Sequence, residues 1–121
     1  MILDTNIVIA CLREQPTAVK AITNWRQSGH ALFISVVTMA ETLSLPTLTA
    51  KEINTIKDFL KTFIPIPANE QTAELAGELQ RTYQIGLADA LIAASASLYR
   101  VALVTRDRQF RKVKEIQTVE V

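Results

Sequence analysis

Short continuous apolar runs alternate along the chain with longer stretches of helical spacing. The runs at 2–3, 31–35 and 101–105 are bounded by polar residues, which is typical of buried strands. The segment 63–67 is a brief extended piece, and 116–121 alternates between apolar and polar side chains as an edge strand does. Together these patterns predict about five strands.

The stretches between the runs carry apolar residues three or four positions apart, as amphipathic helices do. Val19 and Ile22 mark the apolar face of the second stretch, and Ala73 and Ala76 mark that of the fifth. The spacing predicts helices over 7–12, 15–29, 36–45, 50–63 and 69–84.

Residues 87–99 differ from the other helical stretches because almost every side chain there is apolar or small. A helix without a polar face belongs in the core. Strands that alternate with helices favour an α/β fold, a mostly parallel central sheet flanked by helices on both faces. At 121 residues the chain is most simply one domain, 1–121.

Composition places the chain among ordinary globular proteins. Hydrophobic residues make up 49% and charged residues 21%, and no run of apolar residues is long enough to span a membrane. We see no secretory signal, and the single cysteine, Cys11, cannot form an internal disulfide, so we expect a reducing, cytoplasmic setting. The net charge of +1 means that any attraction for nucleic acid must come from a local patch.

Several kinds of active site are absent from the sequence. His30 is the only histidine, which excludes a Ser-His-Asp triad and a histidine-based zinc site. The glycine-rich loops of nucleotide-binding proteins do not occur either. The remaining candidates for chemistry are carboxylates.

Acidic residues follow the predicted strands. Asp4 comes directly after the first strand, Glu41 lies one to two turns into the helix after the second, and Asp107 follows the strand at 101–105. Ligands of open parallel sheets bind beyond the carboxyl ends of the strands, so these three acids are expected at one rim. Asp89 opens the apolar helix at 87–99.

Each acid also has a purely structural interpretation. Asp4 can cap the following helix, Thr38 and Glu41 fit the S/T-x-x-E capping box, Asp89 can interact with a helix dipole, and Asp107 can close a turn. Carboxylates beside apolar residues are costly unless they are paired or bind a metal. Four such acids favour a shared cation site over four separate caps.

Four segments resemble, in order, the acidic motifs of PIN domains: "LDTNIVI", "SVVTMAETL", "IGLADALIAASAS" and "LVTRDRQF". The compact length and "DALIAASA" look most like the VapC toxins of bacterial and archaeal toxin–antitoxin pairs. The resemblance implies catalytic acids at Asp4, Glu41, Asp89 and Asp107, with supporting polar residues at Asn6 and Thr105.

The resemblance also implies an activity, a cofactor and partners. VapC-like proteins are metal-dependent ribonucleases that form homodimers and are silenced by an antitoxin. Mg²⁺ and Mn²⁺ prefer carboxylate and water oxygens, and Mg²⁺ binds only one or two carboxylates directly. We therefore expect Asp4 and Asp89 to be direct ligands, with Glu41 and Asp107 holding bound water or a second ion.

A cluster of basic residues surrounds the last acid, either as a solvated surface or as a grip on RNA phosphates. Its members are Arg106, Arg108, Arg111, Lys112 and Lys114.

Two other classes of function remain as alternatives. One is a non-catalytic PIN-like module that binds RNA or protein. The other is a phosphatase or phospho-receiver domain, which also places an aspartate after a parallel strand. The phosphatase motif needs a second aspartate where Asn6 stands, and a receiver needs a lysine where Arg106 stands, so both fit less well.

Overall fold

Five short parallel strands form one sheet, and helices cover both of its faces. The computed structural model describes all residues from Met1 to Val121. In chain order the elements are β1 (Ile2–Leu3), α1 (Thr5–Leu12), α2 (Pro16–Gln27), β2 (Phe33–Ser35), α3 (Val36–Leu43), α4 (Ala50–Leu60), β3 (Ile64–Ile66), α5 (Glu70–Tyr83), α6 (Leu87–Tyr99), β4 (Leu103–Val104), the 3-10 helix η1 (Arg108–Lys112) and β5 (Thr118–Val119).

The strands lie in the order β3-β2-β1-β4-β5, and every neighbouring pair is parallel. This confirms the predicted parallel sheet, with the segment 116–121 at one edge. The chain moves outward from β1 to β3 and then returns to β4 on the other side of β1. The carboxyl ends of β1 and β4 are therefore the point where the strand order reverses, which is where open α/β sheets bind ligands.

The other edge of the sheet is β3, which the sequence indicated only as an extended piece. Its backbone pairs with β2, and the N–H of Ile64 donates to the carbonyl of Leu32 at 3.0 Å. Pro65 stands in the middle of this strand. Ile64 is half exposed, because no further strand covers the edge.

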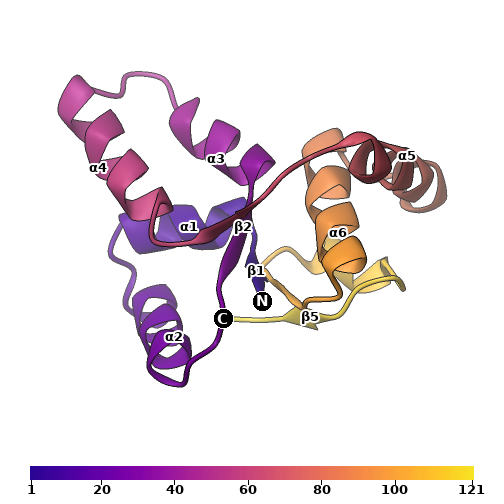
Figure 1. Cartoon of the computed structure of the whole chain (residues 1–121), viewed down its shortest axis with the longest axis horizontal. Helices are drawn as coiled ribbons and strands as arrows, with labels where there is room; N and C mark the ends of the chain where they lie inside the picture. Colours follow the sequence, from indigo (N-terminus) through magenta and orange to yellow (C-terminus); the bar gives the residue numbers. More distant parts are fainter.

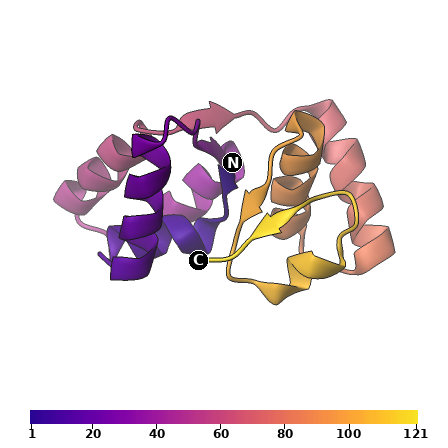
Figure 2. The same cartoon turned by 90° about the horizontal axis from the view of Figure 1, so that it is seen from below.

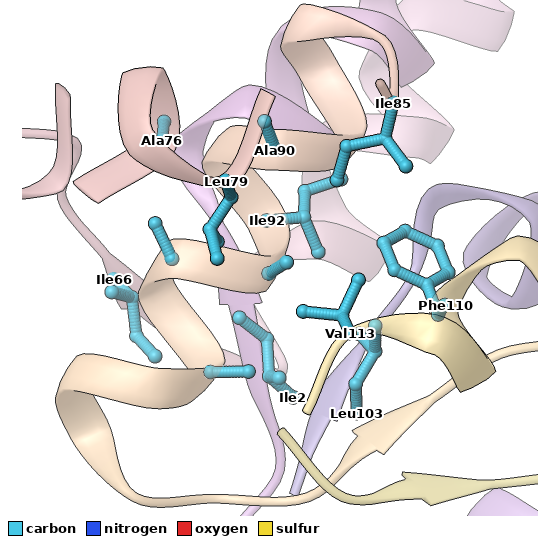
Figure 3. Packing of buried hydrophobic residues seen from close by; sticks show 13 residues of the cluster. Ile2, Ile66, Ala76, Leu79, Ile85, Ala90, Ile92, Leu103, Phe110 and Val113 are labelled. Carbon is cyan, nitrogen blue, oxygen red and sulfur yellow. The ribbon is translucent and has the colours of Figure 1, made fainter. Parts of the chain in front are cut away.

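Side chains of each strand alternate between two separate cores. Ile2 and Leu103 lie in the first core, under α5, α6 and η1 (Figure 3). Leu3 and Val104 lie in the second core, under α1, α2 and α4. Figures 1 and 2 show these two groups of helices on opposite sides of the sheet. The double burial explains why the strands are continuous apolar runs.

Helix α6 lies in the first core, as its composition predicted. The side chains of Ala90 and of residues 92–96 are buried, and α5 packs along this helix. Only the ends of α6 emerge, where Leu87 and Tyr99 are exposed.

In two helices the predicted apolar face is right in part: Ile22 and Ala76 are buried as expected, but one residue of each face is not. Val19 is exposed, and Ala18 faces the core in its place. Ala73 is exposed as well, whereas Thr72 is buried. In both helices, polar or small residues on the buried side weakened the apolar pattern that the sequence offered. None of the helices is both long and apolar enough to cross a membrane.

The first core depends on side chains that α5 contributes. Leu79 of α5 is fully buried there, whereas Leu87, at the start of the neighbouring helix α6, is 60% exposed. We predict that Leu79→Ala lowers the free energy of unfolding by about 3 kcal/mol, because it leaves a cavity. Leu87→Ala is the control and should change it by less than about 0.5 kcal/mol. Urea denaturation of both variants measures the difference, and equal effects would contradict the described packing.

Candidate active site

Asp4 lies between β1 and α1, and both of its carboxylate oxygens are fixed. Oδ1 accepts a hydrogen bond from the backbone N–H of Thr5 at 2.8 Å, and Oδ2 accepts one from the hydroxyl of Thr105 at 2.7 Å. The first bond makes Asp4 the N-cap of α1, which is the structural role that the sequence suggested for it. The side chain is buried, and this burial is the main reason why its pKa is raised.

Glu41 does not belong to a capping box. The N-cap of α3 is Ser35, whose hydroxyl accepts from the N–H of Val37 at 3.0 Å, so Glu41 lies inside the helix. Its Oε1 accepts a hydrogen bond from the hydroxyl of Thr5 at 2.6 Å. The carboxylate of Glu41 therefore reaches across to the start of α1, beside Asp4.

Asp89 lies in the first turn of α6, which begins after Gly86, and its carboxylate accepts no hydrogen bond. Its pKa is raised to about 6, first by burial and then by the negative charges of Asp4, Asp107 and Glu41. Because charges act on one another only over short distances in water, these effects indicate that the fold gathers all four acids in one region.

Asp107 follows β4 and is the N-cap of η1. Its Oδ1 accepts from the N–H of Gln109 at 2.9 Å, and its own N–H donates to the hydroxyl oxygen of Thr105 at 3.0 Å. Since Thr105 also donates to Asp4, this one threonine connects the acids that follow β1 and β4. The cap that sequence reasoning offered as an alternative for Asp107 is present, together with this connection.

The two polar residues expected to support the acids differ in the structure. Thr105 is buried and contacts Asp4 and Asp107, whereas Asn6 is exposed and makes no hydrogen bond to any of the acids. Thr5, which sequence reasoning did not single out, contacts both Asp4 and Glu41. The only signal for Thr5 in the sequence is its position directly after Asp4; that α3 packs beside α1 is not readable from the sequence.

The four carboxylates have no cationic partner. The single ion pair of the structure joins Arg111 to Glu120 and involves none of these acids. No three of the carboxylates lie close enough together to bind one ion directly. This arrangement fits Mg²⁺, which binds one or two carboxylates and keeps several waters, better than it fits a fully enclosed metal site.

The structure divides the basic cluster into residues with partners and residues without. The guanidinium of Arg106 donates to Oε1 of Gln15 at 2.7 Å, to the hydroxyl of Thr17 at 3.0 Å and to the carbonyl of Val121 at 3.3 Å. These bonds hold the end of the chain against the connection between α1 and α2.

Arg111 is also engaged, through its ion pair with Glu120. Arg108, Lys112 and Lys114 are exposed, and their side chains have neither an ion pair nor a hydrogen bond; Lys114 uses only its backbone N–H, which donates to the hydroxyl of Tyr83. They are therefore the members of the cluster that are most available to a ligand.

The raised pKa of Asp89 predicts how pH affects the metal-free protein. The folded state holds this proton up to about pH 6, whereas an unfolded aspartate releases it near about pH 4. Stability therefore falls as pH rises from about 4 to 6. We predict that Asp89→Asn stabilises the protein at pH 7 by on the order of 1 kcal/mol, since solvent screens a half-exposed charge.

Urea denaturation in EDTA at pH 7 and at pH 4.5 measures this effect. The advantage of Asp89→Asn should shrink at the lower pH, and Asp58→Asn, an exposed acid on α4, serves as the control. An Asp89→Asn protein that is less stable than the wild type at pH 7 would contradict the raised pKa of Asp89.

Comparisons with known proteins identify the family and the fold. The chain is similar to solved toxin–antitoxin structures: a complex from Klebsiella pneumoniae (28% identity, TM-score 0.84, 99% of this chain and 98% of that one) and FitAcB from Neisseria gonorrhoeae (26%, 0.70, 97% and 94%). It also shares the fold of VapBC2 from Rickettsia felis bound to a promoter DNA fragment (21%, 0.85, 98% and 96%).

No curated protein matches the chain. The family model of the PIN domain, however, matches residues 1–116, and the fold, the order of the strands and the toxin–antitoxin neighbours all agree with it. The resemblance that the four acidic motifs indicated is therefore confirmed, and the chain belongs to the PIN domain family.

Proposed function

We propose that this PIN domain is a Mg²⁺- or Mn²⁺-dependent endoribonuclease that acts as the toxin of a toxin–antitoxin pair. The observation that carries the proposal is the grouping of Asp4, Glu41, Asp89 and Asp107 without any cationic partner. Four uncompensated carboxylates at the point where the strand order reverses are poorly explained by folding alone, because they repel one another.

Asp4 and Asp89 are the proposed direct ligands of the ion. Asp4 is held rigidly by Thr5 and Thr105, and its oxygens keep lone pairs for a further contact. Asp89 has both oxygens free of hydrogen bonds, and its charge is disfavoured first by burial and then by the other three acids. A bound cation would remove this repulsion and return Asp89 to its ionised form.

Hydrolysis of a phosphodiester needs an activated water, a neutralised phosphate and a stabilised leaving oxygen. When bound, a divalent cation supplies all three. Glu41 uses Oε1 to accept from Thr5, so its Oε2 is available to orient the attacking water and accept its proton. Asp107, whose backbone N–H donates to Thr105, would hold a second water. Thr105 keeps Asp4 and Asp107 at a fixed spacing.

The proposed substrate and the proposed partners are supported by different observations. Arg108 and Lys112 are exposed on η1, the helix that Asp107 caps, and would bind phosphates. RNA in preference to DNA rests on the likeness to VapC toxins. The solved neighbours are toxin–antitoxin complexes, which supports an antitoxin as the natural partner of this chain. A homodimer and a cytoplasmic location complete the proposal.

The nuclease proposal predicts that cleavage requires the acids and the metal. Wild type should cleave a labelled single-stranded RNA with Mg²⁺ or Mn²⁺, and EDTA should abolish cleavage. Asp4→Asn and Asp89→Asn should each lower the rate at least about 100-fold, because each removes a charged ligand. Asp58→Asn, on α4, is the matched control and should retain full activity.

A thermal melt of the same proteins separates the nuclease from a binding module. Millimolar Mn²⁺ should raise the Tm of the wild type by mass action on the folded state, and it should not raise that of Asp89→Asn. A wild type that binds RNA, shows no cleavage and melts at the same temperature with and without Mn²⁺ would be a non-catalytic module.

Two of the free basic residues, Arg108 and Lys112, give a separate prediction about RNA binding. We expect Arg108→Ala with Lys112→Ala to weaken binding and to reduce the salt slope by about 1.4, since two phosphate contacts to a single strand are lost. The control is Lys57→Ala with Lys61→Ala, an exposed pair at the end of α4. Fluorescence anisotropy in the Asp89→Asn background avoids cleavage, and an unchanged slope would remove these residues from the binding site.

A further inference from the structure

Thr5 is the only residue that donates hydrogen bonds to the carboxylates of two of the four acids. Its backbone N–H donates to Asp4 at 2.8 Å, and its hydroxyl donates to Glu41 at 2.6 Å. The first bond is made by the main chain and survives any substitution except proline. The second bond depends on the hydroxyl alone, and it joins helices that begin 31 residues apart at Thr5 and Val36.

A third group fixes the direction of the bond to Glu41. The hydroxyl oxygens of Thr5 and Thr38 lie 3.1 Å apart, and Thr38 is fully buried on α3, one turn before Glu41. A threonine hydroxyl carries one proton, and an ionised carboxylate can only accept. Thr5 therefore gives its proton to Glu41, and Thr38 gives its own proton to Thr5.

This chain of hydroxyls constrains a side chain that is otherwise mobile. A glutamate has three rotatable bonds, and ordering it costs conformational entropy. Holding Oε1 selects one rotamer and leaves Oε2 as the single free oxygen. The donor of this bond, the hydroxyl of Thr5, is itself oriented by the buried hydroxyl of Thr38, which strengthens the hold on Glu41.

We propose that Thr5 is a positioning residue that holds Glu41 in place relative to Asp4. The inference rests on the proposed nuclease function and assigns a role to a residue outside the four acids. It differs from the role of Thr105, whose hydroxyl donates to Asp4 and accepts from the N–H of Asp107. Substituting the hydroxyl of Thr5 therefore affects Glu41 while leaving both bonds to Asp4 intact.

The test compares Thr5→Val, which removes the hydroxyl and keeps the shape, with Thr5→Ser, which keeps the hydroxyl. Thr5→Val should lower kcat for RNA cleavage and weaken Mn²⁺ binding to the RNA-free protein by about tenfold each, with KM within about twofold. Thr5→Ser should stay within about threefold of wild type in both measurements. Thr82→Val is the matched control, since the hydroxyl of Thr82 bonds only the carbonyl of Glu78 on its own helix.

A double-mutant cycle shows whether Thr5 acts through Glu41. In the Glu41→Gln background, Thr5→Val should change the dissociation constant of Mn²⁺ by less than about twofold further. Isothermal titration calorimetry measures these constants, and circular dichroism verifies the fold of each variant. Where Thr5→Val does not fold, Thr5→Ala removes the same hydroxyl without the branched carbon and takes its place.

Three results would overturn the inference. The first is a hydroxyl-free variant within about twofold of wild type in both kcat and Mn²⁺ affinity. The second is Thr5→Ser as impaired as Thr5→Val, which would assign the effect to packing. The third is an undiminished effect in the Glu41→Gln background. A wild type that neither cleaves RNA nor binds Mn²⁺ fails at an earlier step, because it removes the proposed function and this inference with it.

Discussion

The parallel pairing of β1 with β4 is the constraint on which the rest of the structure depends. Leu3 lies opposite Val104 in this pair, so the residues that follow them, Asp4 and Thr105, emerge side by side. Their hydrogen bond of 2.7 Å connects positions 101 residues apart. Both strands are buried on both faces, and a slip of one residue would exchange the two cores. The register that the cores impose is therefore also the register that places the first acid.

The acids combine a structural role and a chemical one. Asp4 caps α1 and Asp107 caps η1, yet each cap uses Oδ1 only. The other oxygen of Asp4 points to Thr105, and that of Asp107 accepts no hydrogen bond from the protein. A helix N-terminus also favours a negative charge, which offsets part of the repulsion among these groups. The capping interpretation and the metal-site interpretation of the sequence are therefore compatible for the same side chains.

The parts of the fold that depend on local pattern were predictable from the sequence. The strands, the buried helix at 87–99 and the placement of acids after strands follow from apolar runs and from the geometry of parallel sheets. Features that depend on contacts between distant elements could not be predicted from the sequence. The exposure of Val19 and Ala73 depends on the rotation of each helix against its core, and the bonds of Thr5 depend on α3 lying beside α1. Likewise, nothing local to Arg106 indicates that its partners are Gln15, Thr17 and the end of the chain.

Pro65 has a consequence for how copies of this protein meet in a crowded solution. Ile64 directs its N–H towards β2, and successive residues of a strand direct their backbone groups to opposite sides, so residue 65 faces the open edge. Proline has no N–H, and the outer side of β3 therefore lacks the donor that an incoming strand would use. A half-exposed isoleucine on a bare sheet edge would otherwise favour edge-to-edge aggregation. The imino acid at this one position thus protects the apolar border of the sheet.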